Sequence, residues 1–259
     1  MPTSGRSGAL LVPMLAIAVS VTAGCQGPQR SERRTSQPSS EPADAPYQAE
    51  VEEGLGAALA ILVDTSGSMR ESAPGDGRPK YIVAREALER MLDATDAFIA
   101  KRPEFPIKIG IYSFASDVRL LHPIAPYNRE SIRHMLQELP SPGGGTAIGD
   151  AMREARPALY RAGVFRKYLL VVTDGENTRG RDPESVARTI FRKSEGAVQI
   201  YFVAFDTSPA KFAFLKEVGG DVVSAGTGNE LRTALDGIYQ GKILAEAIDA
   251  GEGREPVKK

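Results

Sequence analysis

The 259-residue sequence has few of the side chains that support disulfide, imidazole or aromatic-stacking chemistry. It contains one cysteine, two histidines and no tryptophan. A single cysteine cannot form an intramolecular disulfide, so the core must hold the fold without a covalent cross-link. Two histidines leave few ways to build the base that a serine nucleophile needs.

An excess of charge of one sign is also missing. The 32 basic residues nearly balance the 33 acidic ones, and the net charge is -1. No basic surface of the kind that binds nucleic acid is therefore indicated. With 42% hydrophobic and 25% charged residues, the composition is typical of one globular domain with additional polar segments.

The apolar run near the N-terminus is too short to predict a membrane span. The apolar part of residues 8–24 is about 15 residues long, which is the length of a signal-peptide core. Ala23 and Gly24 precede Cys25 and resemble the lipobox of bacterial lipoproteins, in which the cysteine is lipidated. Residues 1–24 are predicted to be a signal peptide, and a general secretory signal with an incidental cysteine is the alternative. The protein is expected in the bacterial cell envelope, anchored by lipid at Cys25. In a Gram-negative bacterium, Gln26 in place of aspartate would favour the outer membrane.

Two polar segments flank the remaining sequence. Residues 25–54 are rich in proline, serine, glutamine and charge, and they predict a disordered tether because they have little apolar surface to bury. Residues 251–259 form a polar tail. The domain is therefore expected over residues 55–250.

Strands and helices alternate within this domain. Near-continuous apolar runs at 57–64, 168–174 and 198–205 predict parallel strands that are buried on both faces. The alternating pattern of 106–114, followed by 118–121, predicts a strand and an antiparallel edge strand.

Apolar residues at helical spacing predict helices from Tyr81 to Ile99, from Ile148 to Leu159 and from Leu231 to Ile248. Pro157 is expected to kink or split the second of these. A capping residue followed by proline predicts two further helices, at Asp182-Pro183 and at Ser208-Pro209. With a last strand near 221–225, the order of elements predicts an α/β fold with a Rossmann-like, doubly wound, mostly parallel sheet and helices on both faces.

Oxygen-bearing side chains gather where the predicted strands end. In sheets of this kind, ligands bind beyond the carboxyl ends of the strands. Asp64, Ser66 and Ser68 follow one strand, Asp174 ends another, and Thr146 lies in a glycine-rich loop before a helix. Five hard oxygen donors without histidine or cysteine favour Mg²⁺ or a similar divalent cation.

These residues resemble the von Willebrand factor type A domain and its metal-ion-dependent adhesion site. The motif of that site, Asp-x-Ser-x-Ser followed by Thr and then Asp, matches at all five positions. The resemblance covers residues 55 to 245 and implies a Rossmann-like sheet with Mg²⁺ or Mn²⁺ at its upper edge. It also implies that the domain binds a protein ligand, which would donate a carboxylate to the metal.

Charged residues in nearby loops are candidates for the face that meets a ligand. Arg70 and Arg78 lie in the loop after the first strand, and Glu176, Arg179 and Arg181 follow Asp174. Four arginines near a cation hint at an acidic ligand, although each taken singly is typical of a solvated surface.

Other functions are less well supported by the residues. An EF-hand on 174–185 has Arg179 where glycine is required and Ser185 where glutamate is required. An enzyme is not expected, although hydrolysis assisted by one Mg²⁺, with Glu176 near the metal, is chemically feasible. The principal alternative is a scaffold or assembly subunit of an envelope complex that does not exchange ligands through a cation.

Overall fold

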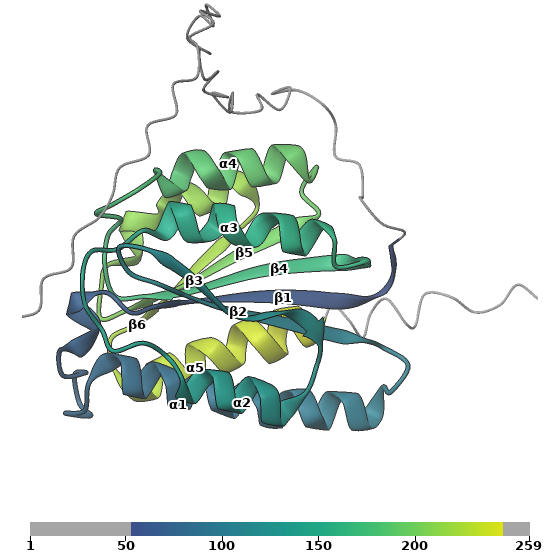
Figure 1. The fold of residues 1–259 in the computed structure, drawn as a ribbon, viewed down its shortest axis with the longest axis horizontal. Coiled ribbons are helices and arrows are strands. Elements are labelled where there is room, and N and C mark those ends of the chain that lie inside the picture. The colour runs from purple at the N-terminus through teal and green to yellow at the C-terminus, as the bar shows by residue number, and fades with distance from the viewer. Residues whose placement is uncertain (1–52, 246–259) are drawn as a thin grey trace, which may run out of the picture. The chain divides into compact units, whose positions relative to one another are not determined.

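A six-stranded sheet organises residues 53–245, the part of the chain that the computed structural model describes (Figure 1). The predicted signal peptide, Cys25, nearly all of the predicted tether and the polar tail lie outside these residues. The strands are β1 (Gly54–Asp64), β2 (Ile107–Phe114), β3 (Val118–Pro126), β4 (Val164–Thr173), β5 (Val198–Phe205) and β6 (Asp221–Ala225).

The strand order is β3-β2-β1-β4-β5-β6. All neighbouring strands pair in parallel except β2 and β3, which pair antiparallel at one edge of the sheet. This confirms the predicted doubly wound sheet with one antiparallel edge strand. Parallel pairing also brings the carboxyl ends of β1, β4 and β5 to the same edge, where the candidate site lies.

Helices cover both faces of the sheet, as Figure 1 shows. Buried apolar side chains of β1 alternate between two core clusters, with Leu59 and Ile61 in one and Ala60 and Leu62 in the other. The first cluster contains side chains of α1 (Lys80–Lys101), α2 (Arg129–Gln137) and α5 (Gly228–Ile238). The second contains side chains of α3 (Ile148–Tyr160), α4 (Pro183–Lys193) and η2 (Pro209–Val218).

Three predictions about helices were wrong in detail. Of the predicted kink or split at Pro157, the split is wrong, since α3 is one helix from Ile148 to Tyr160 with Pro157 in its last turn. The segment after Ser208 is a 3₁₀ helix whose backbone leaves helical geometry at Phe212. The last helix changes from α to π geometry at Tyr239.

Side chains cap the starts of α4 and η2 as predicted. Asp182 accepts a hydrogen bond from the Ser185 amide at the start of α4, and Ser208 accepts one from the Ala210 amide at the start of η2. Among the described residues, no helix combines the length and the apolar character that a membrane crossing requires.

Candidate functional site

Three neighbouring parallel strands each lead directly into an aspartate. Asp64 is the last residue of β1, Asp174 follows β4, and Asp206 follows β5. Since β1, β4 and β5 are adjacent in the sheet, the three carboxylates lie along one stretch of its carboxyl edge. Asp64 is completely buried and Asp174 nearly so.

Both carboxylate oxygens of Asp64 accept a hydrogen bond. The Ser66 amide donates to Oδ1 at 2.7 Å, and the Thr173 hydroxyl donates to Oδ2 at 2.6 Å. Burial raises the pKa of Asp64 to about 6, although these hydrogen bonds act in the opposite direction. A carboxylate held in this way is costly to ionise unless a cation lies beside it.

The two serines link Asp64 to Asp174. Ser66 Oγ lies 3.2 Å from Ser68 Oγ, and Ser68 donates to Asp174 Oδ1 at 2.7 Å. The turn that makes this possible is η1 (Gly67–Arg70), a short 3₁₀ helix that folds the chain back directly after β1. Four of the five predicted oxygen donors are therefore connected through short polar contacts.

Thr146 reaches the same place from the glycine-rich loop. This loop is fixed to its neighbours by backbone hydrogen bonds, since the Gly143 amide donates to Thr65 O at 2.9 Å and the Gly67 amide donates to Gly144 O at 3.1 Å. A Cβ placed on Gly175 would lie 3.9 Å from both Ser68 Oγ and Thr146 Oγ1. The structure thus brings together all five residues predicted from the sequence.

A buried ammonium group is the main feature that sequence reasoning missed. The side chain of Lys80, at the first position of α1, is only 5% exposed. Its Nζ lies 3.0 Å from Asp174 Oδ2, 2.9 Å from Asp206 Oδ2 and 3.4 Å from Glu71 Oε2. Burial alone would lower the pKa of Lys80, but the pairs with Asp206 and Asp174 outweigh it and hold the pKa above its ordinary value.

Asp206 was also missed, although the sequence carries a signal for it. The run that ends in Phe205 and Asp206 repeats the pattern of an apolar strand followed by aspartate, seen also at Asp64 and Asp174. The backbone of Asp206 has a φ of +52°, in the left-handed region that favours glycine. The pair with Lys80 and a 2.7 Å hydrogen bond from its amide to Ala225 O hold it there.

The charged residues predicted to face a ligand fall into two groups. Arg78 pairs with Asp76 and Glu86, Arg181 with Asp150, and Glu176 with Lys211. Arg70 and Arg179 remain beside the glycine-rich loop. Arg70 donates a hydrogen bond to Pro142 O, and a Cβ on Gly145 would lie 3.0 Å from Arg179 Cγ.

The histidines do not join the serines of the site. His134 is exposed on α2. His122 is half-buried on β3, and its Nδ1 has no hydrogen-bond partner among residues 53–245. In the same range, no group of three or more histidine, cysteine, aspartate or glutamate side chains is arranged to hold a metal. Of the five residues predicted for the cation site, two are carboxylates, Asp64 and Asp174, and three carry hydroxyl groups.

The fold and the sequence together define the class of protein. The family model for the von Willebrand factor type A domain matches residues 59–176, which run from β1 through the residues just after Asp174. The chain carries a von Willebrand factor type A domain.

One curated relative shares part of this sequence. The protein YwmC of Bacillus subtilis (strain 168), described as uncharacterized, is 24% identical over 179 residues, which are 64% of this chain and 73% of YwmC.

Solved structures show a similar fold at low sequence identity. The PilB minor pilin from Streptococcus sanguinis is 15% identical, with a TM-score of 0.62 over 79% of this chain and 64% of the pilin. Proximal thread matrix protein 1 from the mussel byssus, solved with zinc in its MIDAS motif, is 19% identical, with a TM-score of 0.54 over 76% of this chain and 47% of that protein. The chain spans less than two thirds of either structure, and these likenesses show the fold alone.

Proposed function

We propose that this domain binds a protein ligand through a divalent cation, Mg²⁺ or Mn²⁺, at the carboxyl edge of its sheet. The observation that carries the proposal is the convergence of five oxygen-bearing side chains from three separate loops. They are Asp64, Ser66, Ser68, Thr146 and Asp174.

The chemistry of this donor set suits a hard cation. Two carboxylates balance a charge of 2+, and hydroxyl oxygens are ligands that Mg²⁺ and Mn²⁺ accept more readily than softer metals do. Each oxygen of Asp64 already accepts one hydrogen bond and keeps a lone pair for a metal or for a metal-bound water. The cation would supply a Lewis-acidic position for a carboxylate of the ligand, while these residues hold it in place.

The proposed setting is the bacterial cell envelope. The signal-like residues 1–24, Cys25 and the polar segment after it support an exported, lipid-anchored protein. Likeness of fold to a minor pilin and to a matrix protein is consistent with a module that binds other proteins.

An assembly role is the second candidate. In this role, the same fold would be part of an envelope complex and would not exchange ligands through a cation. The ion pairs of Lys80 favour this role, because they already balance part of the acidic charge at the carboxyl edge of the sheet. Hydrolysis is less well supported. Glu176, the nearest candidate base in sequence, has a side chain that is 66% exposed and pairs with Lys211.

Thermal unfolding and calorimetric titration with Mg²⁺ and Mn²⁺ test the proposal. At a hundred times its dissociation constant, a cation that binds only the folded state should add about 2.7 kcal/mol of stability. Asp64→Ala should abolish this gain, whereas Asp236→Ala, at an exposed aspartate of α5, should keep it.

The same variants separate the two candidates. If millimolar Mg²⁺ and Mn²⁺ change neither protein, the cation-dependent function is wrong. If the wild type responds, Asp64→Ala should also lose its ligand from envelope fractions. A partner complex that survives Asp64→Ala and Ser66→Ala unchanged would instead support the assembly role.

A further inference from the structure

A pocket of about 280 Å³ lies beside the candidate cation site. Its walls are the turn between β2 and β3, the start of β3 at Arg119, and the loop of residues 140–144. Thr65 also lines it, and Thr65 is the residue between Asp64 and Ser66. Consecutive Cα atoms are about 3.8 Å apart, so Thr65 in the pocket wall lies next to two residues of the cation site. The backbone at Thr65 therefore borders both the pocket and the site.

Hydrogen bonds connect the segments that line the pocket to the loop that carries Thr146. The Gly143 amide donates to Thr65 O at 2.9 Å, and the Ala147 amide donates to Ala115 O at 2.8 Å. The Gly145 amide donates to Ser116 Oγ at 2.9 Å. The turn after β2 and the loop that carries Thr146 are therefore fixed to one another, which gives the pocket a preformed shape.

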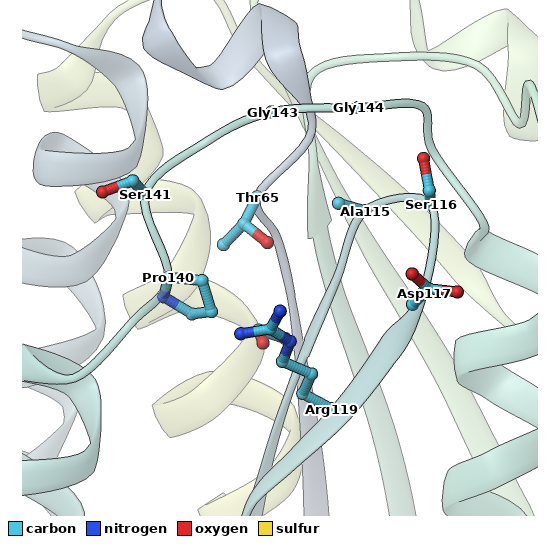
Figure 2. A pocket seen from close by; sticks show the side chains of 10 residues that line it. Thr65, Ala115, Ser116, Asp117, Arg119, Pro140, Ser141, Gly143 and Gly144 are labelled. Atoms are coloured by element: carbon cyan, nitrogen blue, oxygen red, sulfur yellow. The ribbon is translucent and has the colours of Figure 1, made fainter. Parts of the chain in front are cut away.

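The pocket contains the guanidinium group of Arg119 and also the carboxylate of Asp117, and among residues 53–245 these two groups do not form an ion pair. Figure 2 shows the side chain of Arg119 reaching across the pocket toward Thr65 and Pro140. Within residues 53–245, Arg119 forms no ion pair. Arg70 and Arg179, on the other side of the same loop, also lack an acidic partner in this range, and Arg70 donates to the carbonyl of Pro142.

Four other arginines of the domain already have acidic partners. Arg78, Arg129, Arg181 and Arg188 each pair with at least one acidic side chain. An arginine that faces a pocket without such a pair keeps its full capacity to bind a carboxylate through two parallel hydrogen bonds.

We infer that the Arg119 pocket is a second subsite, which takes an acidic side chain of the protein ligand whose other carboxylate binds the cation. This inference rests on the proposed function and adds to it the chemistry of the partner, namely a segment with at least two acidic residues. The pocket volume of about 280 Å³ is large enough to take an acidic side chain.

Short acidic peptides test this inference on the full chain. One set of probes consists of peptides with two glutamates separated by different numbers of glycines. The comparison probes are a peptide with one glutamate and a peptide with one phosphoserine. Each peptide is titrated in saturating Mg²⁺. At least one two-glutamate peptide should bind about tenfold or more tightly than the one-glutamate peptide. Arg119→Gln should remove this advantage and leave Mg²⁺ affinity and one-glutamate affinity unchanged. Arg192→Gln, at an exposed arginine of α4, should keep the advantage.

Each other outcome is decisive. If the one-glutamate peptide binds with Mg²⁺ and the second glutamate adds nothing, or if Arg119→Gln keeps the advantage, the subsite is wrong and the proposed function stands. If the phosphoserine peptide binds more tightly and depends on Arg119, the assignment to a carboxylate is wrong. If Mg²⁺ does not bind at all, the proposed function fails and the two-point inference fails with it.

Discussion

Asp64 places a carboxyl group where water is excluded, and this has a consequence for stability. Its pKa in the folded domain is about 6, above the ordinary value of 3.8, chiefly because burial disfavours the charged form. The folded state therefore favours the protonated group. The resulting stabilisation is complete below about pH 3.8 and is lost as the pH rises through about 6.

Replacement of Asp64 by asparagine should reverse this loss in the absence of metal. Asparagine can accept from the Ser66 amide and donate to Thr173 Oγ1, so the local hydrogen bonds survive. At pH 7 the metal-free variant should be more stable than the wild type by up to about 3 kcal/mol, since each pKa unit corresponds to about 1.4 kcal/mol.

Urea denaturation between pH 4 and pH 7 measures this difference. The gap between Asp64→Asn and the wild type should widen with pH and should close again when Mg²⁺ is added to the wild type. A variant that is less stable than the wild type at every pH would show that the buried charge is already compensated.

Lys80 holds two acidic side chains at once, so its removal should be severe. Lys80→Met leaves the buried carboxylate of Asp174 without its cation, and removal of one partner of a buried pair costs about 3–5 kcal/mol. Saturating Mg²⁺ should restore part of this loss, and the affinity for Mg²⁺ should rise, because a positive charge next to the site has gone.

Denaturation with and without Mg²⁺ checks this prediction, and Lys211→Met is the matched control. Lys211 pairs with Glu176 at the surface, so its loss should cost less than about 1 kcal/mol. Equal losses for the two variants would contradict the view that Lys80 balances the charge of the site.

At the scale of elements, the position of α3 depends on a glycine. A Cβ on Gly149 would lie 2.2 Å from the backbone oxygen of Arg181, so α3 and the loop after β4 could not approach as they do. Gly149→Ala should therefore destabilise the domain by about 1–3 kcal/mol. It should also weaken Mg²⁺ binding, because that helix begins just after Thr146 and that loop begins at Asp174.

The same change in another helix should have the opposite sign. Gly237 is exposed in α5, and a Cβ there would meet nothing within 4 Å. Gly237→Ala should stabilise the domain by about 0.5–1 kcal/mol, since alanine favours helix more than glycine does. Thermal unfolding of the two variants side by side tests both signs.

The sequence predicts elements well where one physical signal dominates. The bounds of β5 are as expected, because a continuous apolar run of eight residues is typical of a strand buried on both faces. The edge strand β3 extends five residues further than predicted. Pro123 and Pro126 argue against a central strand in the sequence, but an edge strand tolerates them. The early start of β4 at Val164 was missed because polar residues interrupt its first half.

The candidate site shows the same division. Its five oxygen donors could be found because each follows a strand or a glycine-rich loop that sequence alone marks. Lys80 could not, since a lysine at the start of a predicted helix is ordinarily solvated. Its partners Asp174 and Asp206 follow β4 and β5 and are far from it in the sequence. Contacts of this kind depend on tertiary structure and leave no local pattern.

For the whole molecule, a cation at this edge should act on global stability. Each of the two core clusters includes side chains of β1, β4 and β5, so the sheet joins both layers into one unit. Mg²⁺ should therefore raise the midpoint of urea unfolding and leave the slope of free energy against urea unchanged. A changed slope, or two separate transitions, would indicate that the loops unfold on their own.

The central strand also has a mechanical consequence. β1 begins at Gly54, continuous with the N-terminal part of the chain, and ends at Asp64, with β2 hydrogen-bonded along one side and β4 along the other. A pull between the N-terminal end of the chain and a ligand at Asp64 acts along this strand. Because both ends of this path lie on β1, the covalent backbone of that strand would carry the load, and the hydrogen bonds to β2 and β4 would hold the strand in place. The path from Gly54 to the candidate binding site is therefore a single continuous strand at the centre of the sheet.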